Sequence, residues 1–219
     1  MKVAEKFISI NGEGLHAGEL AVFIRFPSCN MSCAYCDTKW ANSPETVGEE
    51  MSAAEILSYI KETGVKRVTI TGGEPLLASY IDELLRLLSS ENTLSVEIET
   101  NGSVDFTEYS KTDKRPSFTM DIKCPSSGMS NKCCFENIAV LDFRDCVKFV
   151  VSDENDLLYA ASVIEKYRLT FSTNVIISPV FGAISPEAIV NFMKERKLNG
   201  VRLGIQLHKI IWDPETRGV

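Results

Sequence analysis

Short β-rich segments alternate with amphipathic helical segments along most of the chain, and this order constrains the fold more than any other feature. A strand-helix-strand order predicts an α/β fold with a largely parallel sheet, either doubly wound or curled into a full or partial (β/α) barrel. Most of the predicted strands are apolar enough to be buried on both faces. They are residues 21–26, 67–71, 95–100, 117–122, 146–151, 174–178 and 201–207. Ligands of such sheets bind at the carboxyl ends of the strands.

Helical spacing between the strands supports this order. Ser52 and Glu55 form a capping box at the start of the first helical segment, and Gly64 suits its C-cap. Residues 80–90, 154–167 and 186–197 also carry helical spacing. Residues 102–134 are the least regular, and we expect loops around one strand there, with room for an inserted or shortened helix. No repeat or linker divides the chain, so we expect a single domain over residues 1–219.

Composition limits the classes of function. The chain has 219 residues, of which 44% are hydrophobic and 24% charged, and no apolar run approaches the ~18 residues of a membrane span. The net charge of −7 argues against nucleic acid as the main partner, because phosphate binding needs an excess of Lys and Arg. Seven cysteines in a chain without a signal sequence indicate a reducing compartment. We therefore expect a cytoplasmic enzyme with a small-molecule substrate and no membrane partner.

The strongest chemical signal is the stretch SCNMSCAYC, in which Cys29, Cys33 and Cys36 have the spacing C-x3-C-x2-C. A structural zinc site would close its shell with a fourth ligand, but His16 and Cys124 lie at no customary spacing. Three thiolates on a [4Fe–4S] cluster instead leave one iron free to bind a group that is not protein. The alternative is that these thiols pack as small apolar residues.

A second motif, TGGEP at residues 71–75, ends the next predicted strand. Paired glycines let the backbone approach a ligand closely. Alone, the motif is equally compatible with an ordinary strand-to-helix turn. Its position one α-β unit after the cysteines favours a role in the same site.

The cysteine spacing, Tyr35 before the last cysteine and the GGEP motif together resemble the radical S-adenosylmethionine superfamily. The resemblance implies a partial (β/α) barrel. It also implies that the open iron binds S-adenosylmethionine, that the strand-end glycines hold the methionine part, and that one-electron reduction yields a 5′-deoxyadenosyl radical.

A narrower resemblance is to the 7-carboxy-7-deazaguanine synthases. It is carried by NGEGLHAGELAVFIRF before the cysteines, Asp37-Thr38 after them, ETNGS at 99–103, DIKCPSSGM at 121–129 and the tail QLHKIIWDPETRGV. That family converts 6-carboxy-5,6,7,8-tetrahydropterin to 7-carboxy-7-deazaguanine with loss of ammonia, on the route to queuosine and related 7-deazapurines. The resemblance implies Mg2+ as a further cofactor, a homodimer, and an electron donor such as flavodoxin or ferredoxin.

The same resemblance implies the roles of individual residues. It assigns the [4Fe–4S] cluster to Cys29, Cys33 and Cys36 and the Mg2+ ligand to Thr38. The implied contacts of S-adenosylmethionine are Tyr35, Cys36, Asp37, Gly73, Asp121, Ile122 and Lys123, with Glu99 and Asn101 as further members of that pocket. The implied pterin contacts are the backbone of Ile10, Asn11 and Gly12 and the residues Glu13, Arg25, Thr71 and His208, with Gln206 nearby.

The residue types suit these roles, and each has an alternative. Glu13 would accept hydrogen bonds from the guanidine-like edge of a pterin, or it is a solvated acid. A buried unpaired charge is costly, so we favour a functional partner for Arg25 over an internal salt bridge. The alternative for His208 and Gln206 is a structural role, and the alternative for Asp37-Thr38 is a capped turn.

Two positions depart from the commoner family pattern, in which Gln is frequent at position 11 and Ser-Pro-Lys occurs in some members at 121–123. The resemblance gives no role to Cys124, Cys133, Cys134 or Cys146, and we interpret them as buried or incidental thiols. Two other functions would account for some of these motifs. A glycyl-radical-enzyme activase would have the cysteine and GGEP motifs but not the N-terminal GEG, Asp37-Thr38 or the tail, and a non-enzymatic zinc or iron-sulfur module would have no use for GGEP.

Overall fold

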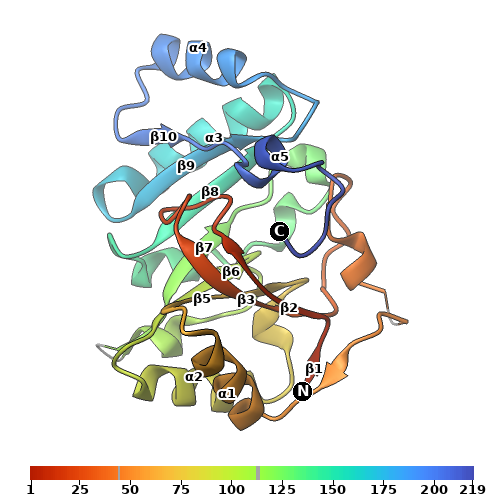
Figure 1. The fold of residues 1–219 in the computed structure, drawn as a ribbon. Coiled ribbons are helices and arrows are strands. Elements are labelled where there is room, and N and C mark those ends of the chain that lie inside the picture. The colour runs from red at the N-terminus through yellow and green to blue at the C-terminus, as the bar shows by residue number, and fades with distance from the viewer. Residues whose placement is uncertain (44, 112–113) are drawn as a thin grey trace.

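Eight strands of the described chain lie side by side in one sheet (Figure 1). The computed structural model describes residues 1–43, 45–111 and 114–219. Across the sheet the order is β10-β9-β8-β7-β6-β5-β3-β2, and every neighbouring pair is parallel except β2 and β3. The strands are β2 (Glu5–Ile10), β3 (Leu20–Phe26), β5 (Arg67–Gly72), β6 (Ser95–Thr100), β7 (Ser117–Asp121), β8 (Cys146–Val151), β9 (Asn174–Pro179) and β10 (Val201–Leu203). The predicted, mostly parallel α/β sheet is confirmed.

Helices follow most of the parallel strands on the outside of the sheet (Figure 1). They are α1 (Ala53–Thr63), α2 (Ile81–Ser90), α3 (Glu154–Tyr167) and α4 (Pro186–Arg196), whereas the short α5 (His208–Ile211) lies beside the loop after β2. The predicted capping box is present: Ser52 N donates to Glu55 Oε2 at 2.7 Å, Glu55 N donates to Ser52 Oγ at 3.2 Å, and Gly64 takes the left-handed C-cap conformation. None of the helices that the structure describes has both the length and the apolar character that a membrane crossing requires.

The irregular region contains short 3-10 turns where a regular (β/α) unit would have a helix. They are η3 (Thr107–Lys111), η4 (Pro125–Ser127) and η5 (Ser130–Lys132), followed by η6 (Phe135–Val140). The expected shortened helix is therefore a set of single turns on either side of β7. The predicted loop DKRPS starts at residue 113, which lies outside the described residues together with residue 112.

The strand prediction was wrong at both edges of the sheet. The edge strand β2 was not predicted, and it pairs antiparallel with β3 through the hairpin between them. The last predicted strand was too long, because β10 ends at Leu203. Gly204 N then donates to Ile177 O at 2.8 Å, and the chain turns so that Leu207 N donates to Gly12 O at 2.9 Å. The residues after β10 thus bring α5 to the loop that follows β2.

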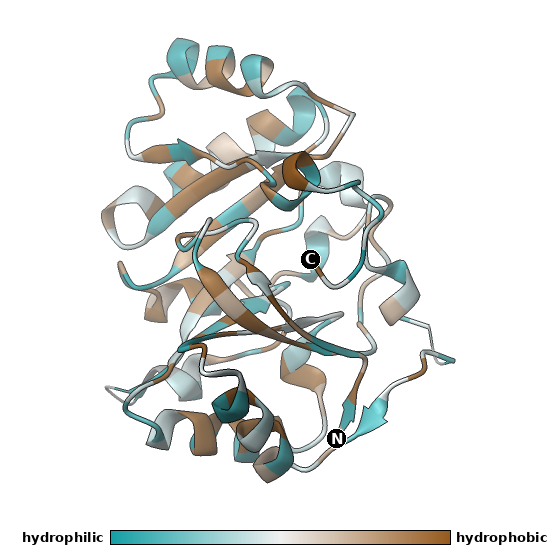
Figure 2. Cartoon of the chain, viewed as in Figure 1, coloured by the Kyte–Doolittle hydropathy of each residue, from teal (hydrophilic) through white to brown (hydrophobic). Residues whose placement is uncertain are grey.

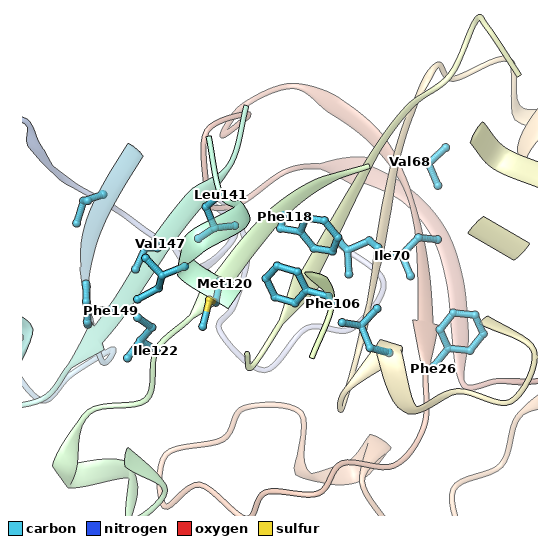
Figure 3. Close-up of a cluster of buried hydrophobic side chains, with 14 of the residues drawn as sticks. Phe26, Val68, Ile70, Phe106, Phe118, Met120, Ile122, Leu141, Val147 and Phe149 are labelled. Carbon is cyan, nitrogen blue, oxygen red and sulfur yellow. The ribbon is translucent and has the colours of Figure 1, made fainter. Parts of the chain in front are cut away.

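The two faces of the sheet have different chemistry. Apolar residues of the central strands point outward under the helices, where Val68, Ile70, Phe118 and Met120 form part of one buried cluster (Figure 3). Figure 2 shows long hydrophobic stretches along the strands, whereas hydrophobic and hydrophilic residues alternate along the helices. The alternate positions face the inside of the curved sheet, and many are polar although buried. The expectation that most strands are buried on both faces was correct, and the inner of the two faces is largely polar.

The inward-facing residues decide where function is located. In the segment RVTIT, Thr69 and Thr71 are 0% and 5% exposed, and in SVEIET, Glu97 is 4% exposed. A polar group in such a position must be satisfied by another polar group, because an unpaired buried group is costly. The interior of the curved sheet is therefore a site for polar contacts.

Candidate active site

The three motif cysteines lie in the loop after β3 and line one cavity of about 780 Å³. All three are free thiols. Asn101 Nδ2 lies 3.5 Å from Cys29 Sγ, and Asn42 Nδ2 lies 3.6 Å from Cys36 Sγ, each as a donor. Cys36 N also donates to Cys33 O at 3.2 Å, which tightens the loop. The loop therefore holds its sulfur atoms around a shared space.

The GGEP turn packs directly on the cysteine loop because its glycines leave no side chain between the two segments. A Cβ on Gly72 would lie 2.2 Å from Phe26 O, and one on Gly73 would lie 2.0 Å from Ser28 O. Gly73 N donates to Phe26 O at 3.1 Å, and Glu74 N donates to Ser28 O at 2.9 Å. This close approach places Gly73 on the cavity wall beside the cysteines.

Glu74 of the same motif was not among the predicted site residues. Its carboxylate is 1% exposed and accepts hydrogen bonds from Asn101 N at 2.7 Å, Thr100 Oγ1 at 2.9 Å and Leu76 N at 3.1 Å. Burial raises the pKa of Glu74, and these hydrogen bonds partly oppose that effect. Glu74 ties the GGEP turn to the end of β6, and the motif that contains it was the available sequence signal.

Four neighbouring strands bring polar side chains to the cavity: Thr71, Glu99 and Asp121 at or next to the carboxyl ends of β5, β6 and β7, and Lys148 in the middle of β8. Thr71 Oγ1 donates to Glu99 Oε2 at 2.8 Å. Lys123 Nζ donates to Asp121 Oδ2 at 2.9 Å. Burial disfavours the charged form of Lys123, but the charge of Asp121 outweighs this effect and raises the pKa of Lys123. The cavity therefore lies where the sequence predicted the site, towards the carboxyl ends of the parallel strands.

Arg25 forms an ion pair with another residue of the chain. This corrects the prediction, which favoured a functional partner over an internal salt bridge. Its Nε donates to Glu5 Oε2 at 3.0 Å, and both side chains line the cavity. Glu5 lies on β2, the strand that was not predicted, and it faces Arg25 in the register of β2 and β3. An internal salt bridge through Nε therefore pairs Arg25 with Glu5 on the cavity wall.

The loop after β2 places Ile10, Gly12 and Glu13 on the cavity, whereas Asn11 lies behind them. Thr69 Oγ1 donates to the side-chain oxygen of Asn11 at 2.8 Å, and Asn11 is 2% exposed. Lys148 Nζ donates to Glu13 Oε2 at 3.1 Å. Glu13 is thus an ion-paired residue of the cavity and not a solvated surface acid.

The Asp37-Thr38 pair also lines the cavity. Lys209 Nζ donates to Asp37 Oδ2 at 3.1 Å. Desolvation opposes ionisation of Asp37, but the charge and hydrogen bond of Lys209 lower the pKa of Asp37. Thr38 precedes the 3-10 turn η1 (Lys39–Ala41), yet its hydroxyl makes no cap hydrogen bond and lies 3.6 Å from Cys36 Sγ. The alternative of a capped turn is therefore not supported by the Thr38 side chain.

The C-terminal tail closes one side of the cavity. Gln206 is 8% exposed, and burial lowers the pKa of His208. The guanidinium of Arg217 lies over the ring of Trp40 at 4.3 Å, next to the cysteine loop. Figure 1 shows the segment after α5 returning toward that loop. Both tail residues that the sequence predicted, Gln206 and His208, line the cavity.

Two predicted residues differ from the others. Every predicted site residue except Asn11 and Ile122 lines the cavity. The Ile122 side chain is fully buried in the outer core (Figure 3), and its N donates to Lys148 O at 2.9 Å. Only the backbone of Ile122 remains for the predicted cofactor contact, because its side chain points to the opposite face of the sheet.

Comparison with known proteins agrees with this geometry. A family model described as the Radical SAM superfamily matches residues 23–121. A 7-carboxy-7-deazaguanine synthase from Clostridium acetobutylicum is 58% identical over 218 residues, covering 100% of this chain and 99% of the relative. A protein of the same name from Chlorobaculum tepidum is 36% identical, covering 100% of this chain and 97% of the relative. The chain belongs to the 7-carboxy-7-deazaguanine synthase family.

A solved structure supports the fold of this synthase family. The crystal structure of QueE from Escherichia coli has a TM-score of 0.69, with 21% identity, and the match covers 94% of this chain and 93% of that one. The predicted radical SAM fold is therefore confirmed. Membership of the 7-carboxy-7-deazaguanine synthase family also rules out the two rival assignments, the activase and the metal-binding module.

Superfamily membership implies a [4Fe–4S] cluster and S-adenosylmethionine, and the cysteine loop suits the cluster. Its donor set is three free thiols that share one cavity, and two of them, Cys29 and Cys36, accept hydrogen bonds from side-chain amides. Iron-sulfur clusters take such thiolates, one on each of several irons. Within the described residues, no group of three or more His, Cys, Asp or Glu side chains is arranged to hold a single metal ion.

The other four cysteines of this synthase-family chain do not line the cavity. Cys124 and Cys146 are 0% exposed, in agreement with the interpretation as buried thiols. Cys133 packs against the core, and Cys134 Sγ donates to Glu136 Oε2 at 3.2 Å.

Proposed function

We propose that the chain converts 6-carboxy-5,6,7,8-tetrahydropterin to 7-carboxy-7-deazaguanine and ammonia. The observation that carries the proposal is a single cavity that collects the cysteine loop, the GGEP turn and a ring of polar strand ends. The substrate and product differ by the elements of ammonia, so the conversion needs no net oxidant or reductant. Relatives that carry the name of this activity match the chain over its full length.

The proposed cofactor side of the cavity is built on the cysteine loop. Cys29, Cys33 and Cys36 would hold the cluster, which, when reduced, supplies the electron that cleaves S-adenosylmethionine to a 5′-deoxyadenosyl radical. The proposed contacts of S-adenosylmethionine are Tyr35, Cys36, Asp37, Gly73, Glu99, Asn101, Asp121, Lys123 and the backbone of Ile122. The Tyr35 hydroxyl donates to Val150 O at 3.1 Å, which ties the cysteine loop to β8 and supports a fixed pocket.

The proposed pterin side lies across the cavity, at Ile10, Gly12, Glu13, Arg25, Thr71, Gln206 and His208, with Asn11 behind them. Unpaired polar atoms support ligand binding there. Among the described residues, Glu13 Oε1 and Gln206 Oε1 are buried without a hydrogen-bond partner. Both are acceptors, and the guanidine-like edge of a pterin supplies donors. Arg25 then offers a cation for the carboxylate of the substrate.

We also propose that Thr38 ligates Mg2+. Mg2+ prefers oxygen ligands, keeps several waters and takes few protein groups, so one hydroxyl beside bound substrate suffices. The support is that the Thr38 side chain lines the cavity and is not used as a helix cap.

The remaining proposals concern the whole protein. We propose that it works as one domain over residues 1–219, as a cytoplasmic homodimer, with a flavodoxin or ferredoxin as electron donor. The domain proposal is supported by a single sheet that contains residues from both halves of the chain.

An anaerobic turnover assay tests the proposed reaction. The reconstituted protein is reduced and given S-adenosylmethionine, Mg2+ and 6-carboxy-5,6,7,8-tetrahydropterin, and the deazaguanine product is measured. We expect product together with ammonia. Formation of 5′-deoxyadenosine without pterin turnover would refute the substrate. Bound zinc at one ion per chain, without the brown absorbance of an iron-sulfur cluster, would refute the proposal that the cysteines hold a [4Fe–4S] cluster.

A further inference from the structure

Lys148 lies in the middle of β8, in the otherwise apolar segment CVKFVV, and its side chain points into the cavity. The residue is 8% exposed. A buried ammonium is costly unless it is paired, so the groups around Lys148 explain why it is there. Two carboxylates provide the pairing: Glu13 Oε2 at 3.1 Å and Asp121 Oδ2 at 3.8 Å.

These two carboxylates come from opposite sides of the proposed site. Glu13 lies on the loop after β2, on the proposed pterin side, whereas Asp121 ends β7, on the proposed cofactor side. Lys148 stands opposite Asp121 in the β7–β8 register. A single ammonium therefore links the residue that would bind the substrate to a residue that would bind the cofactor.

Each carboxylate has one oxygen paired with lysine and the other without a partner. Among the described residues, Glu13 Oε1 and Asp121 Oδ1 are both buried and unpaired, whereas Glu13 Oε2 and Asp121 Oδ2 face lysine ammonium groups. Fixing one oxygen of a carboxylate restricts the direction in which the other points. The free oxygen is then oriented for a donor that arrives with a ligand.

The charge of Lys148 is maintained in the folded protein. Burial disfavours the ammonium, but Glu13, Asp121 and Glu99 together outweigh this effect and raise the pKa of Lys148 well above its usual value. The ion pairs with Glu13 and Asp121 therefore favour the charged form of Lys148.

We propose that Lys148 is a positioning residue for the substrate: it holds Glu13 through Oε2 so that Oε1 receives the donors of the pterin, and it fixes Glu13 relative to Asp121. The inference rests on the proposed function for the identity of the substrate. No reacting atom of the substrate contacts Lys148 in this account, since its effect passes through Glu13.

The test is equilibrium binding of 6-carboxy-5,6,7,8-tetrahydropterin to the reconstituted protein with S-adenosylmethionine present. Lys148→Met removes the charge and keeps the length of the side chain. Loss of a hydrogen bond to a charged group weakens binding by about tenfold or more, so we expect the Kd for the pterin to rise by at least tenfold. Lys148→Arg keeps a cation and should bind the pterin more tightly than Lys148→Met.

Lys123→Met is the matched control, because Lys123 is also largely buried and pairs with Asp121 but not with Glu13. We expect this variant to weaken S-adenosylmethionine more than the pterin. Because Lys148 acts through Glu13, the double variant Glu13→Gln, Lys148→Met should bind the pterin as Glu13→Gln does, within about twofold.

Several outcomes would overturn the inference. A Kd for the pterin unchanged in Lys148→Met, with only the thermal stability lowered, would make Lys148 a structural counter-ion. If the increases in the Kd for the pterin from the two single variants multiply in the double variant, Lys148 acts independently of Glu13. If Lys148→Met does not fold, a Kd of Lys148→Arg between those of wild type and Glu13→Gln would support the inference, whereas pterin binding by Lys148→Arg far weaker than by Glu13→Gln would contradict it. A wild-type protein that binds S-adenosylmethionine but no pterin would refute the proposed function itself.

Discussion

A β-carbon on Gly12 would lie 2.1 Å from Nδ1 of His208, so the imidazole occupies the space that any side chain at position 12 would need. The backbone makes the same connection, since Leu207 N donates to Gly12 O at 2.9 Å. The loop after β2 and the C-terminal tail are therefore docked on each other at one end of the cavity. Glycine at position 12 allows the tail to bring His208 to the site.

Gly12→Ala should displace His208 and weaken substrate binding without affecting the cluster. We expect the KM for the pterin to rise about tenfold, because the displaced imidazole loses its proposed hydrogen bond to the substrate. Iron content after reconstitution should stay at the wild-type level. The steady-state kinetics of the variant measure the first effect, and iron analysis measures the second.

The double variant Gly12→Ala, His208→Ala provides the control. With the imidazole removed, the added methyl group has room, so the double variant should be no worse than His208→Ala alone. A KM for Gly12→Ala equal to that of wild type would show that the loop absorbs the methyl group by moving away from His208.

Gly73→Ala should separate the GGEP turn from the cysteine loop, because the new Cβ would lie 2.0 Å from Ser28 O and 2.4 Å from Asn42 Oδ1. The backbone of the GGEP turn and that of the cysteine loop cannot move apart as easily as a flexible side chain can change its rotamer. We expect iron content after reconstitution, measured per chain, to fall by half or more, with a weaker Kd for S-adenosylmethionine.

Gly64→Ala is the matched control for that change. Gly64 closes α1, has φ of +70°, and a Cβ there would meet nothing within 4 Å. The left-handed backbone should cost alanine about 1–2 kcal/mol of stability, and iron content should stay unchanged. Equal iron loss in both variants would mean that instability, and not the cavity contact, is responsible.

Local chemistry explains which features were predictable from sequence. The capping box of Ser52 and Glu55, the strand periodicity and the cysteine spacing each depend on residues close together in the chain, so their patterns are visible in sequence. The GGEP glycines were recognisable because a close backbone approach admits no other residue.

The features that could not be predicted from the sequence depend on contacts between segments far apart in the chain. Glu13 and Lys148 lie 135 positions apart, and no periodicity indicates that a loop acid and a strand lysine meet. The partner of Arg25 was missed because Glu5 belongs to an edge strand whose pairing arises through a hairpin. β10 was predicted too long because the turn at Gly204 depends on a hydrogen bond to β9.

Thr38→Ala should reduce the response to Mg2+ while leaving the cluster in place. Removing the only protein hydroxyl proposed as a ligand should raise the Mg2+ concentration needed for half-maximal activity by at least tenfold. Thr38→Ser keeps the hydroxyl and should restore most of the response. A Mg2+ titration of turnover, with iron content measured on the same samples, checks both. Identical titrations for Thr38→Ala and wild type would exclude Thr38 as the ligand.

Glu97 should make the stability of the protein fall as the pH rises. It is 4% exposed inside the curved sheet, where burial and the charge of Glu99 raise its pKa to about 7, against the hydrogen bond from Thr119. In the unfolded chain the carboxyl of Glu97 has the ordinary glutamate pKa of 4.5, so it releases its proton at lower pH than in the folded chain. The free energy of unfolding therefore falls as the pH rises from 4.5 to about 7, and Glu97 causes no further loss at higher pH.

Glu97→Gln removes the titration and keeps an acceptor for the hydroxyl of Thr119. The difference in unfolding free energy between variant and wild type should move in favour of the variant by about 2 kcal/mol between pH 5.5 and pH 8. Chemical denaturation at the two pH values measures it. Thr69→Val, at a buried position on the same face that carries no titrating group, should show a pH-independent difference. A pH-independent difference for Glu97→Gln as well would mean that the carboxyl of Glu97 titrates alike in the folded and unfolded chains.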